Sequence, residues 1–242
     1  MSSAAPLSAT EASQAASAVE LEGLHFRYEG GPEILTIPSL AIGHRARVFL
    51  FGPSGSGKTT LLGLLAGVLR ASAGSVRVLG RDLSIMSNAQ RDAFRGAHIG
   101  YIFQLFNLIP YLSVRDNIVL PCRLHGERRQ RLGRQSLEAA ARVAAERLGI
   151  APLLHQQVTR LSVGEQQRVA AARALIGMPE VVLADEPTSS LDQDHRERFL
   201  DLLFECVDEA GATLIFVSHD RTLMPMFQHA VSLSDISRAQ AS

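Results

Sequence analysis

A glycine-rich segment, Gly52–Thr59, has the residue types and the spacing of a phosphate-binding loop. It matches the pattern G-x-x-x-x-G-K-[ST], follows the apolar run Arg47–Phe51 and precedes a helical pattern, which is the context this loop requires. Glycines let backbone N–H groups approach phosphate oxygens, and the start of the next helix adds a potential that favours negative charge. The residues expected to bind a nucleotide here are Gly52, Pro53, Ser54, Gly55, Ser56, Gly57, Lys58, Thr59 and Thr60.

Lys58 is the only lysine in the chain, whereas the other 23 of its 24 cationic residues are arginines. An ammonium group is a compact point charge that suits the β- and γ-phosphates, and the planar fork of arginine would not fit so small a cradle. We therefore expect Lys58 to act in catalysis as well as in binding, and the hydroxyl of Thr59 to bind Mg²⁺.

A second apolar run, Val181–Ala184, ends in two acidic residues, Asp185 and Glu186. Ligand crevices of open α/β sheets lie at the carboxyl ends of the strands. Asp185 is expected to hold Mg²⁺ through water, and Glu186, directed elsewhere, is expected to polarise the attacking water. An apolar strand that ends in acids is common, but beside the phosphate loop it predicts hydrolysis of a nucleoside triphosphate.

The segment Leu161–Arg168 decides among the classes of hydrolase. Ser162 and Glu165 form a capping box for a helix predicted over Gln166–Leu175, and Gly164 beside the capped end makes a natural anion site. A Ras-type GTPase is excluded, because its Asn-Lys-x-Asp motif needs a second lysine. The segment closely resembles the LSGGQ signature of ATP-binding-cassette (ABC) ATPases, so the chain is identified by resemblance as a member of that family.

The resemblance implies roles for four further residues. Tyr28 looks like the aromatic residue that stacks on adenine, although a half-buried strand tyrosine is an equal alternative. Gln104 resembles the glutamine that senses Mg²⁺ and the attacking water, and we count it as both a metal-binding and a catalytic residue. Asp192 falls in a segment that looks like the family's D-loop. His219, after a buried strand, resembles the switch histidine that contacts the γ-phosphate.

The resemblance also implies a homodimer in which two copies pair head to tail. The signature residues of one copy, Ser162, Gly164 and Glu165, would then cover the ATP held by the phosphate loop of the other. Val163 replaces the first glycine of the usual pair, and its β-branched side chain disfavours a positive φ. We expect this replacement to slow closure of the dimer. Glu165 replaces the more common glutamine and preserves the capping box.

Short apolar runs predict the sheet of the fold. Arg47–Phe51, Val181–Ala184 and Thr213–Val217 read as parallel strands buried on both faces, with helical patterns such as Thr60–Leu69 and Glu197–Glu209 between them. The sequence therefore predicts an α/β fold. The resemblance specifies it as a P-loop NTPase (RecA-like) core of ABC type with an inserted helical subdomain.

The predicted organisation has four parts, and a run of helix formers over Ser136–Leu148 marks the inserted one. The parts are a disordered Ala/Ser-rich tail (1–18), the first part of the nucleotide-binding core (19–104), the helical signature subdomain (105–178) and the second part of the core (179–242).

The composition bears on three points: nucleic-acid binding, membrane spans and the redox state of the compartment. The 24 cationic residues balance 24 anionic ones, so non-specific nucleic-acid binding is not expected. No segment reads as a bilayer span, because the longest uncharged apolar stretch, 99–114, falls short of about 20 residues. Cys122 and Cys206 have no metal-ligand neighbours, which favours two small core residues in a reducing cytoplasm over zinc or a disulfide.

The segment Ile99–Pro110 resembles the MacB- and LolD-like group of macrolide-export and lipoprotein-release ATPases. That likeness implies an ATPase subunit that drives a separate integral-membrane permease and is held by it at the cytoplasmic face of the inner membrane. Apolar residues after Gln104 would suit a socket for the permease, although Phe106, Leu108 and Ile109 can also be core. Two alternatives stay open. One is a soluble ABC ATPase not tied to transport. The other is a weakly active or pseudo-ATPase binding subunit, which the replacement of a glycine by Val163 suggests.

Overall fold

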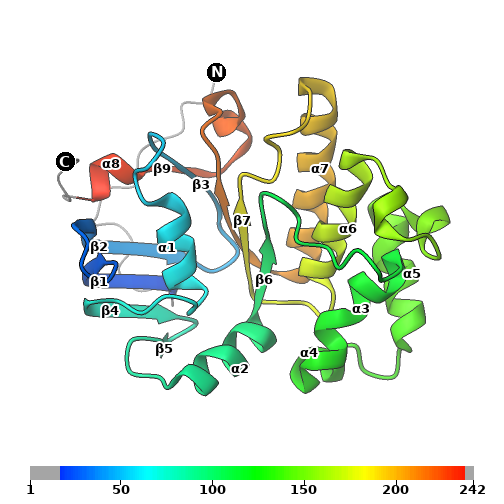
Figure 1. Cartoon of the computed structure of the whole chain (residues 1–242), viewed down its shortest axis with the longest axis horizontal. Helices are drawn as coiled ribbons and strands as arrows, with labels where there is room; N and C mark the ends of the chain where they lie inside the picture. Colours follow the sequence, from blue (N-terminus) through cyan, green and yellow to red (C-terminus); the bar gives the residue numbers. More distant parts are fainter. Residues whose placement is uncertain (1–16, 238–242) are drawn as a thin grey trace. The chain divides into compact units, whose positions relative to one another are not determined.

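The computed structural model describes residues 17–237, which form two compact units (Figure 1). Unit 1 comprises residues 17–95 and 213–237, and unit 2 comprises residues 96–212. None of the helices in this described part is both long enough and apolar enough to cross a membrane.

Unit 2 is one continuous stretch of chain between the two segments of unit 1. The strands are β1 (Ser17–Arg27), β2 (Glu33–Gly43), β3 (Arg47–Phe51), β4 (Ala73–Val78), β5 (Arg81–Asp82), β6 (Ile99–Ile102), β7 (Val181–Asp185), β8 (Thr213–Val217) and β9 (His229–Ser232). The α-helices are α1 (Lys58–Leu65), α2 (Asn88–His98), α3 (Val114–Leu124), α4 (Gly126–Arg131), α5 (Leu137–Arg147), α6 (Val163–Leu175), α7 (Gln193–Ala210) and α8 (Leu233–Ile236). Short 3-10 helices span Ala151–Leu153, Val158–Arg160 and Arg221–Met226.

Unit 1 contains an antiparallel sheet in the order β2-β1-β4-β5, which the sequence did not predict. Along β1, alternate side chains such as Leu24 and Phe26 are buried, as the pleat of a half-covered strand requires. Ser17 and Ala18 open this strand, although they belong to the stretch predicted as a tail. The rest of that tail, residues 1–16, lies outside the described residues.

Three further strands of unit 1 run parallel. β3 pairs with β8, with Leu50 opposite Val217, and also with β9, with Leu50 opposite Val231. Both β3 and β8 were predicted from their continuous apolar runs, and the structure confirms them. Their parallel register matters for the site, because the segments that follow the two strands leave the sheet at one edge.

Unit 2 combines a parallel strand pair with helices. β6 and β7 pair with Ile102 opposite Ala184, and every residue of β7 is buried. Ser136 caps α5 by accepting a hydrogen bond from the backbone N–H of Ala139, which explains why the predicted helix begins there. Helices α3 to α6 fall inside the range predicted as the helical subdomain, whose boundaries at residues 105 and 178 stay a prediction.

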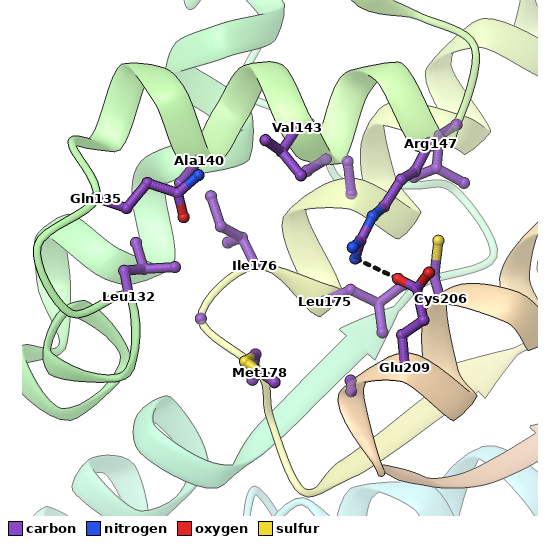
Figure 2. A pocket seen from close by; sticks show the side chains of 15 residues that line it. Leu132, Gln135, Ala140, Val143, Arg147, Leu175, Ile176, Met178, Cys206 and Glu209 are labelled. Atoms are coloured by element: carbon purple, nitrogen blue, oxygen red, sulfur yellow. Dashed lines mark ion pairs between the residues drawn. The ribbon is translucent and has the colours of Figure 1, made fainter.

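A cavity of about 530 Å³ lies in unit 2 among α5, the end of α6 and the end of α7 (Figure 2). Its lining is mostly apolar, and an ion pair between Arg147 and Glu209 lies at its wall. Cys206 is half-buried there, and burial raises the pKa of its thiol.

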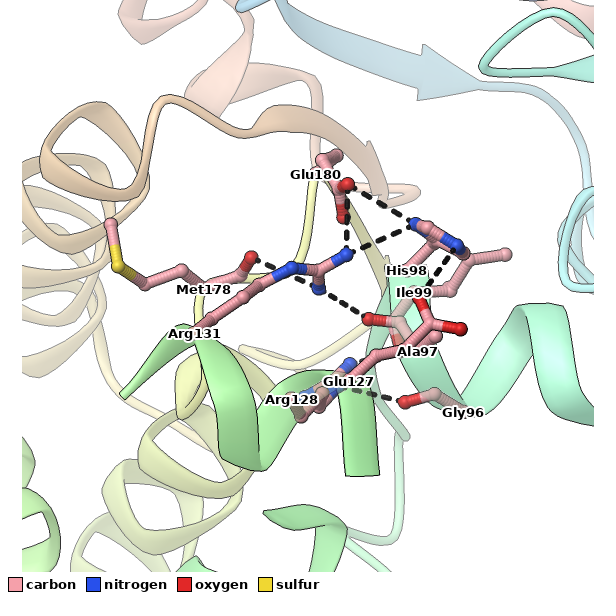
Figure 3. Close-up of polar contacts among 9 residues, drawn as sticks. All are labelled: Gly96, Ala97, His98, Ile99, Glu127, Arg128, Arg131, Met178 and Glu180. Carbon is pink, nitrogen blue, oxygen red and sulfur yellow. Dashed lines mark hydrogen bonds and ion pairs between the residues drawn. The ribbon is translucent and has the colours of Figure 1, made fainter. Parts of the chain in front are cut away.

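Arg128 of α4 joins the ends of two helices to the start of a strand (Figure 3). Its side chain is 2% exposed and donates hydrogen bonds of 2.5 to 3.1 Å to four backbone carbonyls, those of Gly96, Ile99, Ala174 and Ile176. Carbonyls at helix C-termini carry partial negative charge, so they can stabilise a buried guanidinium. Burial lowers the pKa of Arg128 to about 10, so the group stays charged at neutral pH. The end of α6 is thereby fixed.

Candidate active site

The phosphate loop joins the end of β3 to the start of α1, as predicted. Gly55 and Gly57 have φ angles of 78° and 93°, in the left-handed region that glycine tolerates. A Cβ atom added to Gly57 would lie 2.8 Å from Leu35, and one added to Gly52 would lie 2.8 Å from the Ser56 hydroxyl. Larger residues at these two positions would therefore crowd Leu35 and Ser56.

Polar groups in the loop are arranged to meet an anion. Lys58 is 8% exposed, and its ammonium group donates to the carbonyls of Gly52 at 2.9 Å and Pro53 at 2.8 Å. The Ser56 hydroxyl is buried and has no hydrogen-bond partner among residues 17–237. Gly57, the N-cap of α1, provides no side-chain cap, so the first N–H groups of the helix point into the loop. These residues fit a chain of phosphates.

Tyr28 lies against the first turn of α1, the helix that follows the phosphate loop. Its hydroxyl is 3.3 Å from the hydroxyl of Thr60, and its ring meets Phe26 edge-on with centroids 4.9 Å apart. The tyrosine is 48% exposed, so a ring face remains open to a planar ligand. Stacking on adenine stays a prediction that this position supports.

His219 emerges at the same sheet edge as the phosphate loop. It follows β8, and the N–H of the preceding Ser218 donates to the carbonyl of Leu50 at 3.2 Å, one strand residue before the loop. His219 itself is exposed. Unit 1 therefore brings together the phosphate loop, Tyr28 and His219.

Asp185 ends β7 and Glu186 follows it, whereas Gln104 comes two residues after β6, the strand that pairs with β7. Asp185 is 7% exposed, and both burial and the charge of Asp185 raise the pKa of the nearby Tyr101. Glu186 has a φ of 43°, which is rare for this residue type and typical of functional sites, where surrounding structure holds such strain. Hydroxyl, amide and carboxylate oxygens of Thr59, Gln104 and Asp185 are the donor types that Mg²⁺ prefers.

The signature segment forms the predicted capping box at the start of α6. The Ser162 hydroxyl accepts from the N–H of Glu165 at 3.4 Å, and a Glu165 carboxylate oxygen accepts from the Ser162 N–H and hydroxyl, each at 2.8 Å. These bonds, the hydroxyl first and the N–H second, hold the pKa of Glu165 below its usual value. Gly164 follows in the first turn.

Val163 does not meet the steric difficulty expected from the sequence. Val163 is the first residue of α6, and its φ is not positive. Its β-branched side chain is therefore compatible with the backbone. The side chain is 48% exposed and lies next to Ser162. Any effect of Val163 on closure must therefore come from bulk at the surface.

Asp192 caps α7. Its carboxylate accepts from the backbone N–H of His195 at 3.0 Å and lies 2.7 Å from that residue's ring nitrogen Nδ1. The His195 backbone N–H, and then its ring, lower the pKa of Asp192. A nucleotide contact for Asp192 stays a prediction.

The loop 103–112 after β6 exposes apolar side chains. Leu105 is 84% exposed and Tyr111 is 77% exposed. Of the residues that the sequence left open, Phe106 is core at 7% exposure, whereas Leu108 and Ile109 are half-buried.

Sequence reasoning missed Arg173, which lies on α6 and binds this loop. Arg173 is 9% exposed, and its guanidinium donates to the carbonyls of Phe106 at 2.5 Å and Asn107 at 2.7 Å. A signal was present, because an arginine interrupts the small apolar run Val169–Ala174 on a helix whose face is buried. None of the predicted site residues lines the cavity of Figure 2.

Comparisons with known proteins find similar sequences and structures. A family model described as ABC transporter matches residues 35–189. The chain is 43% identical over 192 residues to YbbA of Escherichia coli (strain K12), an uncharacterized ABC transporter ATP-binding protein, and the match covers 78% of this chain and 81% of YbbA. It is 40% identical over 205 residues to the lipoprotein-releasing system ATP-binding protein LolD of Chromohalobacter salexigens, covering 84% of each protein.

A solved structure is similar along nearly its whole length. The dimeric structure of the ATP-binding cassette MJ0796, in a post-hydrolysis state with ADP and Pi, superposes with a TM-score of 0.78 at 29% identity. The match covers 88% of this chain and 93% of the other. The α/β fold predicted from the sequence is thereby confirmed.

Proposed function

The chain belongs to the ABC transporter family, and from this premise we propose how its residues bind ATP, hydrolyse it and pass the energy to a membrane partner. The observation that carries the proposal is the phosphate loop. There the buried Lys58, a buried hydroxyl that has no hydrogen-bond partner within residues 17–237, and a helix start without a side-chain cap lie together.

Binding replaces contacts within the loop by contacts with phosphate. Lys58 exchanges the carbonyls of Gly52 and Pro53 for β- and γ-phosphate oxygens, and Ser56 gains the partner it lacks. Backbone N–H groups at the start of α1 bind further oxygens. The exposed ring of Tyr28 stacks on adenine.

Hydrolysis divides between a base and charge-stabilising groups. Glu186 orients the attacking water and accepts its proton, and His219 donates a hydrogen bond to the γ-phosphate. Thr59, Gln104 and Asp185 would hold Mg²⁺, which would supply positive charge to offset that of the phosphates. Burial of Asp185 keeps its carboxylate in place for this task.

Two copies close around two ATP molecules. The capped N-terminus of α6, with Ser162 and Gly164, meets the γ-phosphate held by the partner copy's loop, and nucleotide shifts the balance between open and closed dimers. Exposure of Ser162 leaves this end accessible to a partner. Glu165 fixes the Ser162 hydroxyl by the capping box.

A separate permease seats on the loop 103–112. Leu105 and Tyr111 present apolar surface that an amphipathic segment of a membrane protein would cover. The ATPase is then peripheral at the cytoplasmic face of the inner membrane, in a transporter or a mechanotransmission complex such as the lipoprotein-releasing kind.

Replacing Glu186 by glutamine tests the ATPase mechanism. Loss of the base should lower phosphate release by purified protein at least about 100-fold, while MgATP binding by calorimetry persists and a dimer accumulates in size-exclusion chromatography. Glu197→Gln, an exposed acid on α7, is the matched control and should hydrolyse ATP normally. Unchanged phosphate release in Glu186→Gln would contradict the assigned role, and absence of MgATP binding would contradict the proposed function as a whole.

A further inference from the structure

Two consecutive residues of the loop 103–112 adopt an unfavourable backbone conformation. Phe106 has a φ of 60° and Asn107 a φ of 48°, in the left-handed region that Asn tolerates but that an aromatic residue seldom occupies. Such residues persist only where the surrounding structure holds them. The backbone conformation of the loop is therefore fixed by neighbouring groups, which the structure identifies.

Arg173 of α6 is one of these groups. Its two terminal nitrogens donate separately to the carbonyls of Phe106 at 2.5 Å and Asn107 at 2.7 Å, so the guanidinium spans the strained pair. Arg173 has no salt bridge to a carboxylate within residues 17–237. Its buried charge is thus stabilised by the loop backbone, and burial lowers its pKa to about 10, which leaves it protonated at neutral pH.

Asn117 of α3 holds the other end of the same loop. Its side chain is fully buried, accepts from the N–H of Ile109 at 2.8 Å and donates to the carbonyl of Ile109 at 3.1 Å. Between and beside the two anchors project Leu105 and Tyr111, which are largely exposed. A partner protein that contacts these side chains would therefore displace a loop that is hydrogen-bonded to both α3 and α6.

The position of Arg173 on α6 connects the loop to the signature segment. The helix begins next to the Ser162 cap and continues to Leu175, so Ser162 and Arg173 are separated by about 16 Å of continuous helix at 1.5 Å per residue. An α-helix of this length moves as one body. The group that meets the nucleotide and the group that holds the loop therefore belong to a single rigid element.

We propose that Arg173 is the positioning residue that links the permease-facing loop 103–112 to the signature end of α6. Displacement of Leu105 and Tyr111 by a membrane partner moves the carbonyls of Phe106 and Asn107, and through Arg173 moves Ser162. Movement of Ser162 on nucleotide binding passes to the loop by the same bonds. The inference rests on the proposed function, in which Ser162 meets ATP in a dimer.

Hydrogen exchange resolved along the chain tests this link in the Glu186→Gln background. Addition of MgATP should slow exchange at residues 162–166 and should also change exchange at residues 105–109. In Arg173→Met the change at 105–109 should be lost while the slowing at 162–166 remains. Arg173→Lys keeps the charge without the planar fork, so it should fold and retain only part of the loop response. Arg168→Met, on the same helix, is the control and should respond at both segments.

The outcomes separate this inference from the function beneath it. A full loop response in both Arg173 variants would overturn the role of Arg173, as would a loop that ignores MgATP while residues 162–166 respond. A response at neither segment would refute ATP-driven dimerisation, and the inference would fall with it. If Arg173→Met only destabilises the protein, its exchange should be faster throughout the chain, with and without nucleotide. Arg173→Lys then decides, and a loop response of full size in that variant would contradict the link.

Discussion

Gln167 lies on α6 with its side chain fully buried, and neither its amide nitrogen nor its amide oxygen has a hydrogen-bond partner among the described residues. A buried polar group without a partner destabilises a protein by about 1–3 kcal/mol. Met has a similar volume and no strong polar group. Gln167→Met should therefore raise the free energy of unfolding by about 1 kcal/mol in denaturant titrations.

Gln166 is the matched control for that change. Its amide nitrogen donates to the carbonyl of Leu161 at 3.0 Å, so Gln166→Met removes a made hydrogen bond and should leave stability the same or lower. If Gln167→Met lowers the free energy of unfolding, the buried amide has partners, such as bound water, and the argument for Gln167 fails.

At the scale of single residues, the sequence predicts roles only where chemistry restricts the residue type. Lys58, Asp185 and Glu186, whose roles stay predictions, were singled out because phosphate and Mg²⁺ would need specific charges after specific strands. Arg173 and Asn117 were not, because their partners are backbone carbonyls, which carry no sequence signal. Arg173 reaches Asn107 across 66 residues of chain, a pairing that only the folded structure reveals.

At the scale of elements, the box that opens α6 should make that helix end sensitive to acid. The pKa of Glu165 lies below its ordinary value of 4.5, chiefly because the Ser162 hydroxyl bonds the carboxylate. A lowered pKa means that this stabilisation is complete above 4.5 and is lost as pH falls through the lowered value. Glu165→Gln should therefore be less stable than the parent at neutral pH, and the difference should vanish in acid.

Unfolding titrations of the two proteins at a series of pH values measure that difference. Glu138→Gln, in the first turn of α5, is a control, since no hydrogen bond joins Glu138 to the Ser136 cap in the described structure. A difference for Glu165→Gln that stays constant from neutral to strongly acid pH would show that the ionised carboxylate is not what stabilises the helix end.

The strands predicted from the sequence are buried on both faces, whereas two of the strands that were missed are buried on one face. Strands β3, β7 and β8 are covered on both faces, so their apolar runs are continuous and were found. β1 and β2 are covered on one face, and Gly23 and Pro38 interrupt their alternation, so the antiparallel sheet was missed. α1 was expected to reach Leu69 but ends at Leu65, because Gly67 turns the chain with a φ of 66°.

At the scale of the whole molecule, membrane association should depend on the exposed loop 103–112. Leu105→Glu places a charge where a permease would bury an apolar side chain, so the permease should no longer co-purify from detergent-solubilised membranes. The measurement is identification of membrane proteins that accompany the tagged ATPase. MgATP hydrolysis by the isolated subunit should be unaffected.

Ile85→Glu is the control for that experiment, because Ile85 is 82% exposed, about as much as Leu105, and lies outside the loop. It should co-purify with the permease as the parent does. Recovery of only soluble partners by the parent chain would favour the alternative of an ABC ATPase that is not tied to transport.

The solitary lysine gives the chain an unusual handle. Apart from a chain-terminal α-amine, acylating reagents meet one primary amine, and that amine sits under the carbonyls of Gly52 and Pro53. A mass increment on Lys58 would thus record whether the cradle is vacant, and bound triphosphate would shield it. Conversely, immobilising this protein on a sensor through amines would attach it by the side chain proposed to bind ATP.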